Sequence, residues 1–173
     1  MAMTLFDVTV PSFQQIVRGL QGAFETARIH AQASGLDPDM LAGWRLADDM
    51  YDLRMQVLRV ASHSRGALDD VQRGTFTIPG RDALDFESMR QVLADAETAV
   101  GGWTREAVEA LAPRKVIFDT GSSPSTFTGE AFLLSFSLPN FYFHAVTAYD
   151  ILRANGVPIG KRDYLSGMRY RLG

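Results

Sequence analysis

Four stretches of this sequence repeat apolar residues at intervals of three and four, and this spacing most constrains what the chain can fold into. It places one apolar stripe along an α-helix, and such a stripe has to be buried against other helices. In the first stretch the stripe consists of Phe13, Val17, Leu20, Phe24, Ala27 and Ala31. The pattern therefore predicts an all-α fold, a four-helix bundle.

The first helix is expected over residues 11–33, and Gly35 follows it as a helix stop. Thr4 and Asp7 have the spacing of a capping box, in which two side chains satisfy free backbone N–H groups at the start of a helix. If this box forms, the helix begins there and Pro11 kinks it.

The second and third helices follow an ordered connection over residues 36–52, which mixes Pro, Gly and Asp with large apolar residues. The second apolar stripe spans residues 53–71 and stops before Gly74. The third spans residues 89–107, with Asp85 as the expected N-cap.

The last helix is expected over residues 129–155, ended by Gly156 and Pro158, and it is apolar around most of its circumference. Before it, residues 115–128 hold two short β-like runs, which predict a small hairpin or an extended crossover. No internal repeat or low-complexity linker is visible, so we expect residues 1–173 to form a single domain.

The composition narrows the classes of function. The chain has 173 residues and no cysteine, which excludes disulfides, thiolate metal sites and a cysteine nucleophile. Its net charge of −3 creates no field that would attract nucleic acid. Polar residues interrupt the longest apolar stretch, residues 131–148, so we expect a cytoplasmic protein without a membrane span.

The three histidines of the chain are candidate site residues. His30 lies near the end of the first helix, where the helix dipole favours a protonated imidazole, so a structural role is expected there. His63 and His144 lie late in the second and last helices, and each can point into the bundle. Gln56 and Asn140 lie at helical spacing from them, on the same faces.

Two interpretations of these histidines stay open. Neutral imidazoles bind zinc, nickel or ferrous iron, and bundles build such sites from facing helices. A site of His63, His144 and Asn140 would need a further donor, such as Asp48, Asp49 or a water molecule. In the other interpretation, the histidines are hydrogen-bonded groups of the core or of a metal-free pocket.

Aromatic residues gather in and beside the last helix. They line an apolar pocket, or else they belong to the core or to a dimer interface. These residues are Phe132, Phe136, Phe141, Tyr142, Phe143 and Tyr149.

The C-terminal tail is basic, and we expect it to dock on the bundle because Tyr164 and Leu165 can anchor it. Lys161 or Arg162 is expected to pair with an acidic group before the second helix. That group could instead cap the second helix or act as a general base; it consists of Asp48, Asp49 and Asp52.

The sequence resembles a DinB-like bacterial family of unknown function. The resemblance covers nearly the whole chain and is carried by RLADDMYDL at residues 45–53, LPNFYFH at 138–144, AYDILRANG at 148–156 and GKRDYL at 160–165. It implies an up-down-down-up four-helix bundle of the DinB/YfiT type, often dimeric, with a metal held by three histidines. Some members of the wider superfamily are thiol-dependent transferases or isomerases.

In that superfamily one histidine comes from the second helix and two from a His-x-x-x-His on the last. The resemblance places His63 at the first position, and Asn140 and His144 at the other two, so one ligand of three differs. The expected function is small-molecule binding in a pocket of Gln56, His63, Asn140, His144 and Tyr149. A metal-dependent hydrolase or thiol-dependent transferase with a degenerate metal site is one form of it. The alternative is a non-catalytic structural or interaction homodimer with a buried polar network.

Overall fold

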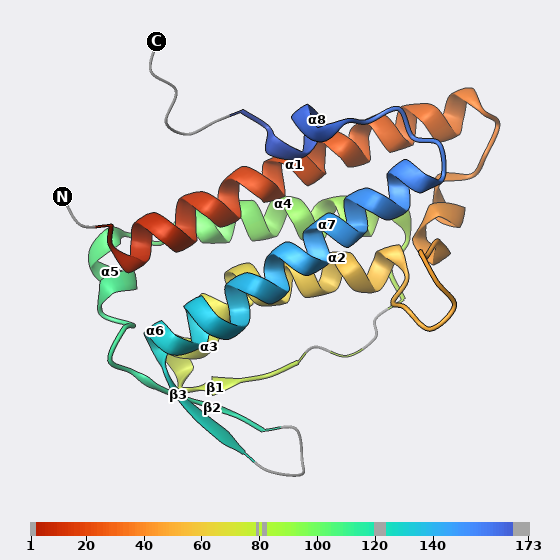
Figure 1. Ribbon diagram of the computed structural model, residues 1–173. Helices are drawn as coiled ribbons and strands as arrows, with labels where there is room; N and C mark the ends of the chain where they lie inside the picture. Colours follow the sequence, from red (N-terminus) through yellow and green to blue (C-terminus); the bar gives the residue numbers. More distant parts are fainter. Residues whose placement is uncertain (1–2, 79, 81–82, 120–123, 168–173) are drawn as a thin grey trace.

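The computed structural model describes residues 3–78, 80, 83–119 and 124–167, and it confirms the predicted helical bundle. The first and last long helices run in one direction and the two between them in the other, so the topology is up-down-down-up (Figure 1). The four long helical segments are α1 (Leu5–Ala33); α2 (Leu53–Ala61) with η2 (Ser62–Gly66) and α3 (Ala67–Arg73); α4 (Phe86–Gly101); and α6 (Gly129–Ala131) with η3 (Phe132–Ser137) and α7 (Leu138–Ala154).

The first helix begins at the predicted capping box. The hydroxyl of Thr4 accepts a hydrogen bond from the N–H of Asp7, and the Asp7 carboxylate accepts one from the N–H of Thr4. The helix continues through Pro11, and its predicted apolar stripe is completely buried. In the folded protein α1 packs against both α4 and α7.

The second helix contains a π-helical turn that its apolar spacing did not predict. Asp52 caps α2, because its Oδ1 accepts the N–H of Met55 at 2.9 Å, so the acidic group serves the capping role considered above. The turn η2 then lies between α2 and α3, and Gly74 ends the helix with a positive φ of 84°. A π turn holds one more residue than an α turn, and such turns are frequent at functional sites.

The third helix is shorter than predicted. It begins at the expected N-cap Asp85 but ends at Gly101, so the prediction that it runs to residue 107 is wrong. Two consecutive glycines weaken the helix at this point. The hydroxyl of Thr104 then accepts the N–H of Ala107 at 3.2 Å and starts a separate helix, α5 (Arg105–Glu109).

The predicted hairpin consists of β2 (Lys115–Phe118) and β3 (Ser125–Thr128), which pair in antiparallel fashion. A third strand, β1 (Thr75–Phe76), pairs with β2 in parallel and was not predicted. Two residues are too few to give a periodic signal. The sheet brings Phe76 and Phe118 next to the last helix, where both pack against Phe136.

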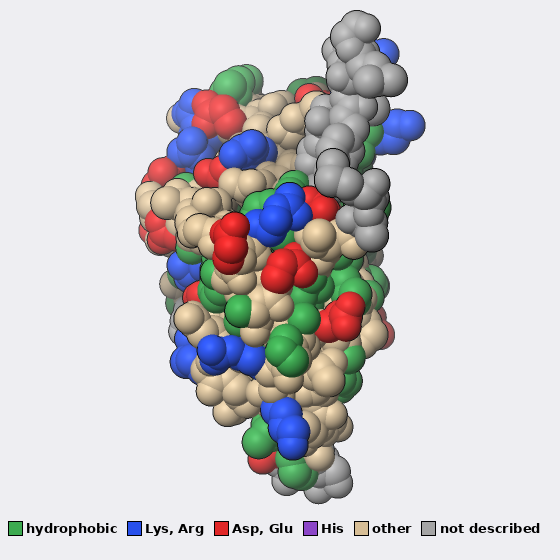
Figure 2. All heavy atoms as spheres, turned by 90° about the vertical axis from the view of Figure 1, so that its left-hand side faces the viewer, with side chains coloured by type: hydrophobic (Ala, Val, Ile, Leu, Met, Phe, Trp, Pro, Cys, Tyr) green, Lys and Arg blue, Asp and Glu red, His purple; other side chains and the backbone are tan. Residues whose placement is uncertain are grey.

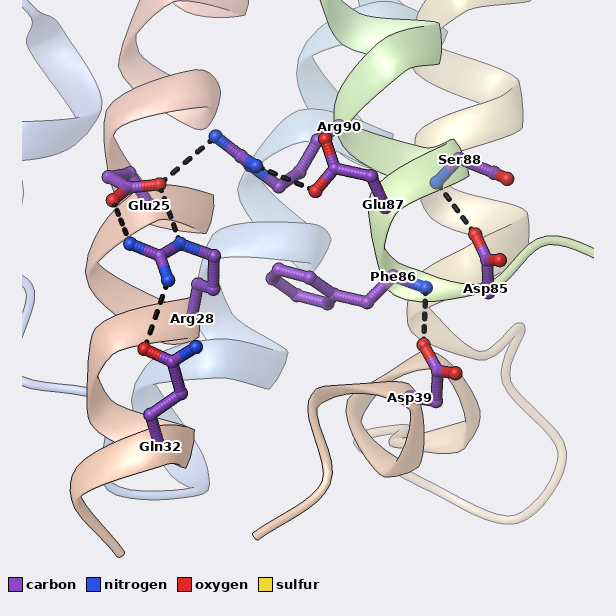
Figure 3. Close-up of polar contacts among 9 residues, drawn as sticks. All are labelled: Glu25, Arg28, Gln32, Asp39, Asp85, Phe86, Glu87, Ser88 and Arg90. Atoms are coloured by element: carbon purple, nitrogen blue, oxygen red, sulfur yellow. Dashed lines mark hydrogen bonds and ion pairs between the residues drawn. The ribbon is translucent and has the colours of Figure 1, made fainter. Parts of the chain in front are cut away.

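Polar contacts join the connection after α1 to the start of α4 (Figure 3). The connection contains a 3-10 helix, η1 (Pro38–Gly43), whose Asp39 Oδ1 accepts the N–H of Phe86 at 2.9 Å. Glu25 of α1 pairs with Arg28 on its own helix and with Arg90 of α4. The connection is thus ordered, as predicted.

The C-terminal tail docks, but not where its charge suggested. It forms α8 (Lys161–Leu165), which lies along α1 (Figure 1). Gln15 Nε2 donates to the carbonyls of Leu165 and Gly167 at 2.9 and 3.0 Å. The predicted ion pairs of the tail with Asp48, Asp49 and Asp52 are wrong: Lys161 and Arg162 are exposed, and none of the ion pairs between described residues joins them to that group.

On the surface, charges of both signs are interspersed. Figure 2 shows the molecule from the α5 side, where acidic and basic side chains alternate with apolar ones and no histidine is visible among the described residues. In the described ranges, none of the helices combines the length and the apolar character needed to cross a membrane.

Two glycines of α1 provide a matched test of how the tail docks. A methyl group at Gly19 would overlap the backbone carbonyl of Tyr164, whereas one at Gly22 would meet nothing within 4 Å. We expect Gly19→Ala to displace α8 and lower the free energy of unfolding by about 1–3 kcal/mol. Gly22→Ala should raise it by about 0.5–1 kcal/mol, because alanine favours helix.

Urea unfolding and limited proteolysis of the tail measure both effects. If Gly19→Ala were as stable and as protease-resistant as Gly22→Ala, the close contact between α1 and α8 would be disproved.

Candidate functional site

The packing of α2 and η2 against α7 brings two predicted site residues together. His63 comes from the π turn η2 and His144 from α7, and their rings stack with centroids 5.8 Å apart and planes 10° from parallel. Both are nearly buried, with 5% and 8% of their surface exposed. We call them and their polar neighbours the histidine site.

A chain of hydrogen bonds determines which nitrogen of His144 carries the proton. Gln56 is 1% exposed, and its Nε2 donates to the carbonyl of Tyr51 at 3.0 Å. This bond orients the amide so that Oε1, an acceptor, lies 2.8 Å from His144 Nδ1. His144 Nδ1 therefore carries the proton, and its Nε2 carries a lone pair.

The fully buried Ser137 sets the same tautomer at His63. Its hydroxyl donates to the backbone carbonyl of His63 at 3.0 Å, which uses its proton. The same oxygen lies 3.5 Å from His63 Nδ1, so it can only act as an acceptor there, in a weaker contact. This contact favours the tautomer of His63 that has its proton on Nδ1 and a lone pair on Nε2.

Both Nε2 atoms are accessible. Neither of them has a hydrogen-bond partner among the described residues. No side-chain nitrogen or oxygen in these residues is completely buried without a partner, so each of the two atoms keeps some accessible surface. The site therefore holds two hydrogen-bond acceptors without a partner among the described residues.

Aromatic rings form the walls around the two imidazoles. Phe76 stacks on His63 at 5.5 Å and Phe136 meets it edge-on at 5.5 Å, while Phe143 meets His144 edge-on at 5.3 Å. Of the aromatic residues predicted to gather in and beside the last helix, Phe132 and Phe141 belong to the core instead.

Arg59 is the site residue that the sequence analysis missed. It lies on α2, three residues after Gln56 and four before His63, and it is 8% exposed. Its guanidinium carbon is 5.7 Å from the centre of the Tyr51 ring. The spacing to Gln56 and His63 was a usable signal, because residues three and four apart share one helix face.

Burial and positive charge keep the two imidazoles neutral. Burial, followed by the charges of His144 and Arg59, lowers the pKa of His63 to about 3. Burial, followed by the charge of Arg59, lowers the pKa of His144 to about 4. Near neutral pH neither ring binds a second proton.

The other predicted site residues lie differently. Asn140 is one turn before His144 on the same face, and its Nδ2 donates to the carbonyl of Phe136 at 2.7 Å. Tyr149 does not join the site: it packs against Tyr164 of α8, with ring centres 5.7 Å apart. The structure therefore does not bring its ring to the two imidazoles.

The acidic group before α2 lies in a separate hollow. This hollow of about 360 Å³ is lined by Asp48, Asp49 and Asp52 together with Arg45 and Arg54, among others. These carboxylates are thus next to arginines, and Asp52 already caps α2. No contact between this group and either imidazole is recorded in the described part of the chain.

The residues present do not fit the three-histidine metal site that the resemblance implies. No group of three His, Asp or Glu in the described ranges is close enough to share an ion. Asn140 offers only an amide, a weak ligand for zinc, nickel or iron. The positive charge of Arg59 also acts on both imidazoles and opposes a second cation there.

The two neutral histidines predict how stability depends on pH. In the unfolded chain they bind protons near pH 6.5, but in the folded chain only near pH 3 to 4. Their contribution to the free energy of unfolding is therefore complete above pH 6.5 and is lost as the pH falls toward 4. Each histidine costs up to about 1.4 kcal/mol per pH unit in this window.

Urea unfolding at several pH values between 7 and 4.5 measures this slope. His144→Gln should reduce it by about half. A free energy of unfolding that is constant over this window would contradict buried, neutral histidines.

Comparisons with known proteins agree with this architecture. The family described as "Domain of unknown function (DUF1993)" matches residues 5–165. A crystal structure of a DinB family member protein from Shewanella denitrificans is similar to this chain, with a TM-score of 0.81 and 32% identity over 98% of this chain and 96% of that one. None of the curated proteins matches. This chain therefore belongs to the DUF1993 family and is a DinB-like domain of unknown function.

Proposed function

We propose that the protein binds a small molecule at the histidine site without a resident metal ion. The observation that carries this proposal is the shared tautomer of His63 and His144, whose accessible Nε2 atoms are both acceptors. Burying two imidazoles and a glutamine costs stability unless each polar atom is satisfied. A ligand that donates hydrogen bonds to the two Nε2 atoms satisfies the last of them.

The basicity of the imidazoles favours binding over general-base catalysis. A general base works best when its pKa is near the pH at which it acts. With pKa values lowered to about 3 and 4, His63 and His144 are weak bases near neutral pH. The metal-dependent hydrolase and transferase activities implied by the resemblance need an ion for which the donor set is incomplete.

Restoring the missing ligand tests the metal-free site. We expect wild-type protein purified without a metal-affinity tag to hold substoichiometric metal, even after incubation with zinc or nickel. Asn140→His places a third imidazole one turn from His144 and should increase the affinity for nickel by about tenfold or more. Inductively coupled plasma mass spectrometry and calorimetry measure both quantities.

Asn155→His is a matched control, because Asn155 also donates to the carbonyl four residues before it, at 2.8 Å, but at the far end of α7. It should leave nickel affinity unchanged. One equivalent of tightly held metal in the wild-type protein, lost on replacing His63 or His144, would disprove a metal-free site.

A second candidate function, a homodimer, is favoured by the outer face of the last helical segment. Large apolar side chains on this face are exposed, although other apolar residues of the segment are buried in the core. Such an exposed patch is typical of an interface between protein chains. The residues of this patch are Leu134, Tyr142, Phe143 and Val146.

A charge in the middle of that patch tests the homodimer. We expect the wild-type protein to sediment as a dimer and Val146→Asp to sediment as a monomer, because an aspartate is costly to bury. Ile29→Asp, at an exposed apolar position of α1, should remain dimeric. A wild-type protein that is monomeric at all concentrations in analytical ultracentrifugation would rule this candidate out.

A further inference from the structure

A hollow of about 430 Å³ lies beside the π turn η2, with residues of α2 and α3 on one side and Val92 of α4 on another. This volume is within the range of pockets that bind small organic molecules. The described residues that line it include neither His63 nor His144, so it is separate from the histidine site. We call it the η2 hollow.

Ser62 gives the η2 hollow a nearly buried hydroxyl group. This residue is 6% exposed and lines the hollow. A serine within a helix often bonds the carbonyl four residues before it, as Ser64 does with Val60 at 2.7 Å. The hydroxyl of Ser62 has no hydrogen-bond partner in the described part of the chain, and its oxygen keeps some accessible surface. A nearly buried hydroxyl costs stability unless a bound molecule satisfies it.

Two opposite charges line the same hollow without pairing. Arg65 lies three residues after Ser62, and Asp69 lies four residues after Arg65. Both are partly buried. Opposite charges four residues apart on a helix often form an ion pair. Among the described residues, however, neither side chain has a hydrogen bond or an ion pair, so both can bind charged groups of a ligand.

The other two charged residues of the described lining neutralise each other. Asp70 is 3% exposed, pairs with Arg73 and accepts the N–H of Thr77 at 3.1 Å. The hollow therefore has one available positive group and one available negative group, and its lining has no net charge. A ligand with a single charge would leave one of the two groups unpaired.

Apolar side chains form the rest of the wall. Leu58 and Ala61 are buried residues of α2, while Leu84 and Val92 come from the connection before α4 and from α4 itself. Aliphatic side chains of this kind favour an apolar group that leaves water. The wall therefore fits the hydrocarbon part of a ligand.

We infer that the η2 hollow binds an α-amino acid with an apolar side chain. Arg65 and the Ser62 hydroxyl donate hydrogen bonds to its carboxylate, and Asp69 accepts hydrogen bonds from its ammonium group. Its hydrocarbon side chain packs against the apolar wall. This second binding site goes beyond the proposed function and does not depend on the histidine site.

Three related probes separate the two charged interactions. Leucine has a carboxylate, an ammonium group and a branched aliphatic side chain; leucinamide replaces the carboxylate by a neutral amide; isocaproate lacks the ammonium group. We expect calorimetry on the full-length protein to give the highest affinity for leucine. Each of the other two should bind about tenfold more weakly or less, as expected for the loss of hydrogen bonds to a charged group.

Substitutions then assign each interaction to its residue. Arg65→Met should lower the affinity for leucine to that for leucinamide, and Asp69→Asn should lower it to that for isocaproate. Arg153→Met is the matched control, because Arg153 also has no ion pair among the described residues but is exposed near the end of α7. It should leave all three affinities unchanged. Thermal unfolding checks that each variant is folded.

The outcomes separate this site from the histidine site. Equal affinities for leucine and leucinamide, or a preference for leucine that survives in Arg65→Met, would overturn the inference. It would also be overturned if leucine gave no heat of binding at millimolar concentration. His144→Gln should leave the affinity for leucine unchanged; a loss as large as that of Arg65→Met would place the binding at the histidine site instead. The metal measurements on Asn140→His test the proposed function whichever result is found.

Discussion

The contact between the second and the last helix is the constraint on which the rest of the structure depends. It buries the polar side chains of Gln56, His63, Ser137 and His144 beside apolar core residues. Buried polar atoms need partners, and here each one determines the next: a backbone carbonyl orients the glutamine, and the glutamine orients an imidazole. A shift in the register of these two helices would separate these groups from their partners.

The same contact holds two of the three donors of the metal site that the resemblance implies. A metal site needs donors that converge and a field that favours a cation. Here Asn140 directs its amide N–H to its own helix, and Arg59 contributes a positive charge beside both imidazoles. The hydrogen bonds that hold histidine ligands from behind are nevertheless present at His63 and His144. The chain thus has the supporting hydrogen bonds of such a centre but an amide in place of its third imidazole.

Most of the fold could be predicted from local signals. The apolar stripe from Phe13 to Ala31, the caps Thr4, Asp52 and Asp85, and the helix-ending Gly74 depend only on neighbours in sequence, and the structure has all of them. The end of the third helix was missed because the apolar spacing continues past Gly101 and Thr104. The helix-ending signal of these two residues was given less weight than the spacing. Strand β1 and the place where α8 docks depend on tertiary contacts. The spacing of apolar residues along the sequence gives no information about such contacts.

The site was predictable only in part, for a similar reason. Periodicity gave the faces on which His63 and His144 lie, and these faces do meet. Nothing in the local sequence shows that the ring of Tyr149 packs against Tyr164 of α8. Arg59 was overlooked because an arginine on a helix is ordinarily exposed to solvent. Its burial here depends on tertiary packing, which the local sequence does not show.

The π turn at His63 links the length of the second helix to the composition of the site. Each residue advances an α-helix by about 100°, and a π turn absorbs one residue beyond the α-helical count. If one residue were deleted within Ser62–Gly66, the turn would become α-helical and the two halves of the helix would keep the faces that they present to the core. The side chains within the turn itself would change position. Deleting or inserting one residue here therefore changes which side chains the turn contributes to the site. In an alignment of relatives, gaps at this turn matter as much as substitutions.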